Sequence, residues 1–425
     1  MSLARPVLML CYYFPPLGTS GTYRSLQFAR RLPQFGWRPQ VLSVAEAREP
    51  WASRDVPIPP EIAIQRAPEW NLHGKVMFLN GVTSRLWELC GREWTTNYWQ
   101  ELLCIPDPQI AWRVVSAGTR LAAGADCIYA SCSPFSAALK GLAIKGRSGK
   151  PLVLDFRDPW TLNPHHRHSR LHSVLARRME RRAILGADRV IFNTEGTTRL
   201  YRQRYPEAAE RMRTLPNGYD QLNEARPEEL PRDRFVIMHV GSFYGTRSPD
   251  LLLQALAELR DPALEFVQIG GAFAGQERFR SAVTMRVSGP LPREEALRQM
   301  RTANLLYLRQ GREAGVEDYV SVAAKTYEYL ATGLPVLADC PPGDNLQLVR
   351  RYAARHYCVA EPSVEQLKAA VCRAREEGPA YRPRVLPEFA AAFDRDALTK
   401  RLAEILNEAC DDVRTTRRGP AETDA

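Results

Sequence analysis

Charged residues beside glycine-rich segments are the part of this sequence that could do chemistry. In the second half of the chain, HVGSFYGTRSP (residues 239–249) places Arg247 at the start of an expected helix. AAKTYEYLATG (residues 323–333) places Lys325 and Glu328 three residues apart, on one helical face. Guanidinium and ammonium groups bind phosphates, and a carboxylate accepts hydrogen bonds from ribose hydroxyls. A surface salt bridge between Lys325 and Glu328 is the simpler alternative.

A similar loop follows the first apolar run. PPLGTSGTYR (residues 15–24) contains Gly18, Ser20 and Gly21 and leads into an amphipathic helical stretch. Helix N-termini carry partial positive charge that can bind a phosphate, and glycine lets the backbone approach the phosphate closely. A plain strand-to-helix turn explains the loop equally well, because it matches neither GxGxxG nor the Walker sequence. Gly241 likewise follows an expected strand in the second half.

Two carboxylates and an arginine end another apolar run. LVLDFRDPW (residues 152–160) brings Asp155, Arg157 and Asp158 to the carboxyl end of an expected strand. The carboxylates could do acid–base work or orient a hydroxyl group. Alternatively, Arg157 pairs with one aspartate and caps a turn.

Four histidines between residues 165 and 172 raise the question of a metal site. His168 and His172 are spaced i, i+4 on an expected helix. The nearby sequence offers no cysteine or acidic residue to complete a ligand set, and Arg167 and Arg170 would repel a cation. We therefore expect no metal here, and interpret the segment as a basic loop near an anionic substrate.

Length and composition indicate a chain with two domains. Its 425 residues exceed the size at which one hydrophobic core stops growing. The nine cysteines are scattered and form no CxxC pair, which argues against a disulfide framework. No apolar stretch approaches the roughly 20 residues that span a bilayer, so we expect a cytoplasmic protein. The net charge of +10 favours anionic partners.

Apolar β-rich runs alternate with amphipathic stretches along the chain, which is typical of α/β domains with parallel sheets. The alternation restarts after a segment rich in proline and charge. The expected parts are a first domain over residues 1–215, a linker over 216–234, a second domain over 235–385, a C-terminal helix over 386–410 and a disordered tail over 411–425.

Two further segments have alternative interpretations. Tryptophans and leucines between Trp70 and Trp112 indicate core packing, or else contact with a membrane surface. The basic amphipathic stretch 170–185 is an ordinary solvated helix face, or else contacts anionic lipid. Nucleic acid is not expected as a partner, because no nucleic-acid-binding motif is visible.

Taken together, these segments resemble the retaining, nucleotide-sugar-dependent glycosyltransferases of the GT-B fold, in group 1 or family 4. The resemblance covers most of the chain and is carried by YYFPPLGTSGTYR, CIPDPQIAW, SCSPFSAAL, VLDFRDPW, LPNGYD, HVGSFYGTRSP and AAKTYEYLATGLPVLADCPPGDN. It implies two doubly wound, Rossmann-like domains facing across a cleft. It also implies that the second domain holds the donor, that the first holds the acceptor, and that the C-terminal helix returns to the first domain.

The resemblance also assigns residues to the donor. Arg247 and Lys325 match positions that bind the diphosphate, and Glu328 matches the one that binds ribose. The donor-binding set is completed by the loop with Gly18, Ser20 and Gly21, by Gly241, and by Arg24 as an added charge. Asp158, with Arg157, is the best candidate for contact at the reacting sugar. Such enzymes need no divalent metal, and the donor is a substrate rather than a cofactor.

Two departures from the family pattern leave the catalytic residue open. The family's E-x7-E pair would place a glutamate at Val320, with Glu317 and Asp318 only nearby, and the usual histidine after the strand is replaced by Arg157 and Asp158. The predicted function is retaining sugar transfer to an acceptor hydroxyl in polysaccharide or glycoconjugate biosynthesis. A non-catalytic nucleotide-sugar-binding or partner protein and a nucleotide-sugar epimerase are the alternatives. A nicotinamide dehydrogenase fits poorly, because no GxGxxG with a following acid is present.

The acceptor and the location remain open on the sequence. A glycan, a lipid-linked intermediate and a small metabolite are all compatible acceptors. The basic charge and the apolar segments are also compatible with peripheral contact with anionic membrane at the inner face of the plasma membrane.

Overall fold

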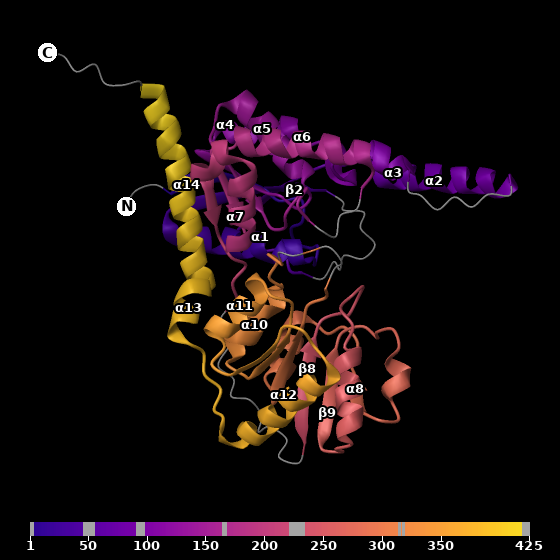
Figure 1. Cartoon of the computed structure of the whole chain (residues 1–425). Helices are drawn as coiled ribbons and strands as arrows, with labels where there is room; N and C mark the ends of the chain where they lie inside the picture. The colour runs from indigo at the N-terminus through magenta and orange to yellow at the C-terminus, as the bar shows by residue number, and fades with distance from the viewer. Residues whose placement is uncertain are drawn as a thin grey trace. The chain divides into compact units, whose positions relative to one another are not determined.

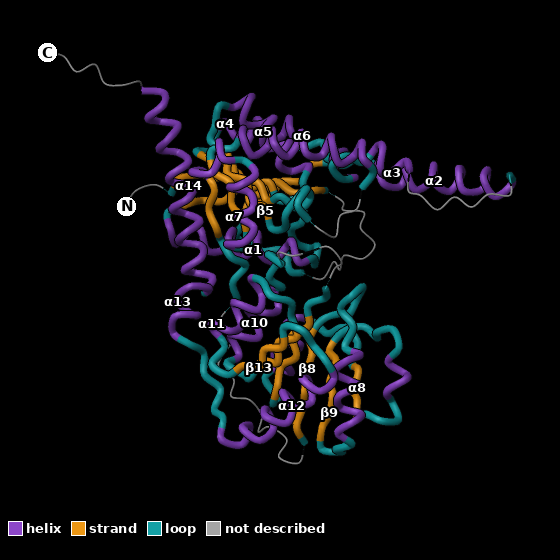
Figure 2. Tube along the Cα trace, viewed as in Figure 1, coloured by secondary structure: helices purple, strands orange, loops and turns teal. Residues whose placement is uncertain are grey.

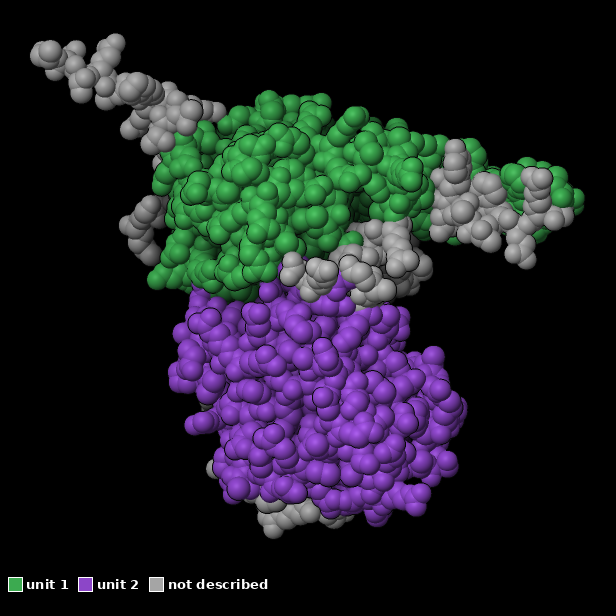
Figure 3. Space-filling model, in the orientation of Figure 1, with its two compact units in different colours: residues 1–216, 398–425 green, residues 217–397 purple. Residues whose placement is uncertain are grey.

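The computed structural model describes residues 4–45, 56–90, 98–163, 168–220, 234–312, 316 and 319–418. The chain divides into two compact units, one formed by Met1–Pro216 with Leu398–Ala425 and the other by Asn217–Ala397 (Figure 3). Each unit contains one parallel sheet, covered by helices on both faces (Figure 2). The prediction of two Rossmann-like α/β domains is therefore confirmed.

The sheet of the first unit has seven parallel strands in the order β3-β2-β1-β4-β5-β6-β7. Its strands are β1 (Arg5–Leu10), β2 (Trp37–Val44), β3 (Ala63–Ala67), β4 (Cys127–Ser131), β5 (Leu152–Phe156), β6 (Arg189–Phe192) and β7 (Met212–Thr214). Side chains alternate across this sheet: Leu8 and Leu10 join one hydrophobic cluster, whereas Val7 and Met9 join the other. Burial on both faces explains why the central strands are continuously apolar.

Helices of the first unit form a layer on each face of this sheet (Figure 1). One cluster includes residues of α4 (Val115–Ala123), α5 (Ser136–Ser148), α6 (Arg170–Gly186) and α7 (Glu195–Arg204). The other includes residues of α1 (Ser20–Arg31) and of the C-terminal α14 (Arg395–Arg418). Two further helices, α2 (Leu72–Leu89) and α3 (Tyr98–Leu103), lie between β3 and β4 in the sequence.

The second unit has six parallel strands in the order β10-β9-β8-β11-β12-β13. They are β8 (Phe235–Val240), β9 (Leu264–Ile269), β10 (Thr284–Val287), β11 (Leu305–Arg309), β12 (Val336–Asp339) and β13 (His356–Val359). One face packs on α8 (Asp250–Leu259) and α12 (Val364–Glu377). The other packs on α9 (Arg293–Met300), α10 (Ala324–Thr332) and α11 (Asp344–Tyr352).

The C-terminal segment differs from the expected single helix over 386–410. It forms α13 (Pro387–Phe393), whose Phe389 and Phe393 pack with Tyr219 in the second unit, and then α14. The α14 helix runs to Arg418, so residues 411–418 continue the helix where the sequence predicted a disordered tail. Most of the expected linker, residues 221–233, lies outside the described residues. Among the described residues, no helix is long and apolar enough to cross a membrane.

Candidate functional site

In the first unit, α1 is joined to the end of β5 by a buried ion pair. The guanidinium of Arg24 donates to both carboxylate oxygens of Asp155, at 2.8 and 3.0 Å, and also to the carbonyl oxygens of Leu215 and Pro216. Tyr129 also donates to Asp155, and both members of the ion pair are buried. These donors of Arg24 hold the sheet and the helix together, and an added charge for the donor phosphates stays a prediction.

The structure brings Gly21 and Arg157 together, although 136 positions separate them in the sequence. α1 begins at Ser20, so Gly21 lies in its first turn and only Gly18 lies in the preceding loop. A Cβ atom at Gly21 would lie 2.5 Å from Nη1 of Arg157 and 3.1 Å from the Tyr13 ring. Gly21 is therefore required for the close approach of the Arg157 guanidinium to the start of α1. Burial lowers the pKa of Arg157, an effect that the charge of Asp158 opposes.

The residues after Arg157 include one exposed carboxylate and a firmly held tryptophan. The Asp158 side chain is exposed and is therefore accessible to a ligand. Trp160 is buried and stacks on Phe135, with ring centroids 5.1 Å apart. The buried Glu180 of α6 accepts hydrogen bonds from the Thr161 N–H and from Tyr201, at 2.7 and 2.9 Å. Sequence reasoning treated the helix of Glu180 only as a basic amphipathic stretch and missed this anchor.

In the second unit, Lys325 lies over the glycine that ends β8. A Cβ at Gly241, whose φ is +116°, would lie 2.5 Å from Nζ of Lys325. The same ammonium lies 3.0 Å from Nε2 of the buried His239. Burial and the Lys325 charge hold the pKa of His239 well below its usual value, so a neutral imidazole accepts from the ammonium. Burial and nearby Arg247 lower the pKa of Lys325 to about 8.

Arg247 completes a cationic group with Lys325 at the carboxyl end of β8. It lies three residues before α8, and its guanidinium packs over the Tyr244 ring at 4.6 Å and donates to that hydroxyl. Its charge lowers the pKa of Lys325, which indicates that the two cations share one electrostatic environment. Burial and the charge of Arg247 outweigh the opposing effect of Glu328 on the pKa of Lys325, so an anion bound beside these cations would be favoured.

Glu328 lies one helical turn after Lys325 and is already engaged. Its Oε1 accepts from Nη2 of Arg293 at 2.7 Å, and Arg293 also pairs with Asp220 at 3.3 Å. The simple surface pair between Lys325 and Glu328 is therefore not what the structure contains. His239 and Arg293 are neighbours of the candidate site that sequence reasoning missed, although His239 stands in the quoted HVGSF segment.

Val320 takes the place of the first acid of the family pair and is buried, with 8% of its surface exposed. Glu317 and Asp318 lie outside the described residues. Within the described residues of this segment, no carboxylate replaces the missing acid.

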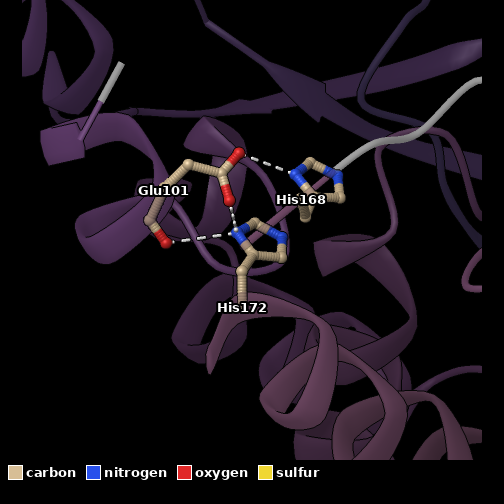
Figure 4. Close-up of side chains that lie close together, drawn as sticks. All are labelled: Glu101, His168 and His172. Atoms are coloured by element: carbon tan, nitrogen blue, oxygen red, sulfur yellow. Dashed lines mark hydrogen bonds and ion pairs between the residues drawn. The ribbon is translucent and has the colours of Figure 1, made fainter. Parts of the chain in front are cut away.

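The histidine segment contradicts one sequence argument. Glu101, 67 residues before His168, supplies the acidic partner that the local sequence lacks: its Oε1 lies 2.8 Å from Nδ1 of His168 (Figure 4). His172 lies on the same carboxylate, with its Nδ1 3.4 Å from Oε2. His165, His166 and Arg167 lie outside the described residues. The statement that nothing completes a ligand set is therefore wrong.

Comparison of sequences relates this chain to a family model and to a curated enzyme. The model of Glycosyltransferase Family 4 matches residues 22–221. The D-inositol 3-phosphate glycosyltransferase of Thermomonospora curvata is 26% identical over 275 residues, which are 56% of this chain and 61% of that protein. The chain thus matches about three fifths of the length of this curated relative.

Comparison of structures extends the likeness to nearly the whole chain. HepE of Anabaena, solved with UDP and glucose, superposes with a TM-score of 0.61 at 16% identity, covering 95% of this chain and 99% of HepE. The apo form of the lipopolysaccharide outer core galactosyltransferase WaaB gives a TM-score of 0.55 at 12% identity, covering 96% and 99%. At these identities the likeness establishes the fold, which is GT-B.

Proposed function

We propose that this chain, which has the GT-B fold of the group 1 glycosyltransferases, is itself a glycosyltransferase that uses a nucleotide diphosphate sugar. The observation that carries the proposal is that Lys325 lies against Gly241, with Arg247 near enough for its charge to lower the pKa of Lys325. These cations lie at the carboxyl end of a parallel strand, where ligands of doubly wound sheets bind. HepE, of the same fold, has been solved with UDP and with UDP-glucose, which supports a nucleotide-sugar donor here.

The cations would act on the leaving group. As the bond between sugar and diphosphate breaks, negative charge develops on the diphosphate, and fixed cations in a half-buried site stabilise it without reorganisation. Lys325, oriented by His239, and Arg247 would supply this stabilisation in place of a divalent ion at the diphosphate. Transfer is therefore proposed to continue in the presence of a chelator.

Glu328 is proposed to bind the ribose. A carboxylate can accept several hydrogen bonds, so Glu328 can keep Arg293 while accepting from a ribose hydroxyl. Arg293 would then fix the carboxylate rotamer before the donor arrives.

The first unit is proposed to supply the acceptor side. Asp158 is exposed beside the Arg157 guanidinium, and Gly21 allows that guanidinium to lie against α1. Asp158 would orient a hydroxyl at the reacting sugar, and the anomeric configuration would be retained. The product would belong to a polysaccharide or glycoconjugate.

The experiment is a panel of nucleoside diphosphates and nucleotide sugars, read by thermal shift and by product formation. Removing one charged hydrogen-bond partner costs about 1.5–3 kcal/mol, so Lys325→Ala and Glu328→Ala should weaken binding about 10- to 100-fold. Lys368→Ala, which removes a lysine paired with Glu258 on the surface of the same unit, is the matched control and should bind normally. Nuclear magnetic resonance of the initial product reads the anomeric configuration.

A panel without any stabilising nucleotide, or normal binding by both variants, would remove the donor site from the proposal. Inversion of configuration would correct the stereochemistry alone. A new nucleotide sugar formed without an added acceptor would indicate an epimerase instead.

A non-catalytic binding protein is the second candidate, and buried Val320 favours it. The position expected to hold a glutamate presents an apolar side chain, so one polar contact of the family pattern is missing. Tight donor binding with no transfer to glycan, lipid-linked or small-molecule acceptors would support this candidate. Transfer to any acceptor would exclude it.

Peripheral membrane contact is proposed for the surface formed by α2, α3 and the start of α6. Phe78 and Leu86 of α2 are 72% and 58% exposed, and Leu171 of α6 is 55% exposed. Lys75 and Arg85 add positive charge along α2. Exposed apolar side chains with nearby cations favour the interface of an anionic bilayer, which would place the protein at the cytoplasmic face of the membrane.

Co-sedimentation with vesicles tests this surface. Phe78→Ser with Leu86→Ser should reduce binding to vesicles containing phosphatidylglycerol, whereas Val385→Ser, a partly exposed valine in the second unit, should not. Equal binding by both variants, or none by the wild type, would contradict membrane contact.

A further inference from the structure

Glu101, His168 and His172 form a cluster that sugar transfer does not use. Glu101 comes from α3, His168 precedes α6, and His172 lies in its first turn (Figure 4). Their candidate ligand atoms all lie within 4.8 Å of one another. Two imidazoles and a carboxylate are the ligand types of protein sites for zinc and similar divalent ions.

The two histidines approach the same carboxylate from one side. Nδ1 of His168 lies 2.8 Å from Oε1, and Nδ1 of His172 lies 3.4 Å from Oε2 and 3.2 Å from the Glu101 carbonyl oxygen. Two atoms bound to one zinc ion at a tetrahedral angle are about 3.3 Å apart. The separations between carboxylate and imidazoles are thus close to those of a shared ion.

We propose that Glu101, His168 and His172 bind a divalent transition-metal ion of the zinc class. The Ser169 N–H donates to Oε2 of Glu101 at 2.9 Å and helps to hold the carboxylate toward the two rings. Such hydrogen bonds to a ligand are a regular part of protein metal sites. The ion would therefore join α3 to the start of α6.

Binding requires one ring to turn. The imidazoles are stacked, with centroids 3.9 Å apart and planes 3° apart, so their in-plane lone pairs lie in separate, nearly parallel planes and do not meet. The His168 side chain is 33% exposed, whereas that of His172 is 4% exposed. His168 is thus the ring with room to rotate toward a common ion.

The surroundings leave space for further ligands. All three residues line one cavity of about 530 Å³ in the first unit, together with Trp160, Asp107 and Cys104. Three protein ligands and an open position are typical of zinc sites that bind water or a ligand oxygen. Cys104 lines the same cavity but is not among the residues whose ligand atoms come together.

Metal titration of the whole protein, after chelator treatment and desalting, tests the proposal by a readout that does not need activity. Calorimetry should find one Zn²⁺ per chain bound by this site, and Co²⁺ should give a visible d–d spectrum without a thiolate charge-transfer band. Glu101→Gln, His168→Gln and His172→Gln should each weaken binding at least about tenfold. His73→Gln, which removes an exposed imidazole on α2, should leave it unchanged.

Several results with these variants would overturn the proposal. A thiolate band, unchanged affinity in all three variants, or no binding by the wild type would do so. Loss of binding in His165→Gln/His166→Gln with normal binding in His168→Gln would assign the ion to other histidines. Because His172 is buried, thermal melting without metal checks its folding, and the more exposed His168 keeps the test decisive if His172→Gln unfolds.

Discussion

At two glycines of the candidate sites, the absence of a side chain leaves space for a neighbouring cation. Gly21 makes room for the guanidinium of Arg157, and Gly241 makes room for the ammonium of Lys325. In each case the neighbour is the end of a flexible cation, so a methyl group would displace the charge before it disturbs the core. These positions therefore link backbone geometry to the placement of charge.

Gly21→Ala should reduce transfer at least about tenfold, because its methyl group would overlap Nη1 of Arg157. The free energy of unfolding should change by less than about 1 kcal/mol, since helical alanine offsets part of the steric cost. Gly146→Ala in α5 is the matched control, because a Cβ there meets nothing within 4 Å. Kinetics and urea titration check both variants, and an equal loss of stability and activity in Gly21→Ala would make Gly21 purely structural.

Lys325 should take up a proton when a nucleoside diphosphate binds above neutral pH. Its pKa is about 8 in the free protein, so at pH 8.5 about a quarter is protonated. A bound diphosphate raises this pKa, so about 0.7 proton should enter at pH 8.5 and much less at pH 7. Affinity should correspondingly fall as the pH rises above 8.

Calorimetry in buffers of different ionisation enthalpy measures this uptake. Lys325→Met should abolish the excess uptake at pH 8.5, and Lys368→Met should preserve it. The same uptake at both pH values would contradict the lowered pKa.

At the scale of elements, buried polar contacts fix the segments that carry the first unit's candidate residues. Arg24 connects α1 to the end of β5, and Glu180 connects α6 to the loop after β5. Both sets of contacts lie in the interior, where the dielectric constant is low. Removing one partner there leaves a buried polar or charged group without a hydrogen bond or counter-charge, which is costly.

Arg24→Met should destabilise the first unit by about 3–5 kcal/mol, because it leaves the buried Asp155 carboxylate without its cation. Arg30→Met on the same helix removes only an exposed pair with Glu61 and should cost less than about 1 kcal/mol. Urea denaturation compares the two. Normal stability of Arg24→Met together with weakened donor binding would instead indicate that Arg24 acts at the donor site.

Glu180→Ala should cost at least about 3 kcal/mol, because the donors of Thr161, Tyr201 and Tyr205 lose their acceptor. Glu210→Ala, an exposed glutamate in the same unit, serves as the control. Denaturation and the fluorescence of Trp160 report the effect. A small change in both the stability and the fluorescence of Glu180→Ala would show that the hydrogen bonds to Glu180 do not hold the loop after β5.

In the molecule as a whole, the order of the segments in the sequence does not match their division between the two units. α14 follows the second unit in the sequence, yet its Leu402 and Leu406 belong to a core cluster of the first unit with Val7 and Met9. The first unit therefore depends on residues at both ends of the described chain.

Leu406→Ala should lower the stability of the first unit by about 2–5 kcal/mol, because a fully buried leucine leaves a cavity. Differential scanning calorimetry should show the thermal transition of that unit moving down. A nucleoside diphosphate should raise the transition of the second unit, where Lys325 lies. Leu171→Ala, at an exposed position, is the control, and an unchanged transition in Leu406→Ala would contradict the packing of α14.

The two α/β domains could be predicted from the sequence, because continuously apolar strands alternating with amphipathic helices are buried only in parallel sheets covered on both faces. The sequence also indicated the cationic segments around Arg247 and Lys325, since glycines and charges close to one another in the chain reveal them. The exact start of α1 and the extension of α14 to Arg418 were missed, because the ends of helices depend on weak local preferences.

Which distant residues meet became clear from the folded units alone. Packing within these units paired Arg24 with Asp155, set Gly21 against Arg157, placed His239 beneath Lys325 and brought Glu101 to the histidines. Periodicity along a chain reports which face of an element is buried, but not the element that covers this face. Contacts between distant segments depend on how the whole unit packs. The partner of each charged side chain therefore depends on this packing and could not be predicted from the sequence.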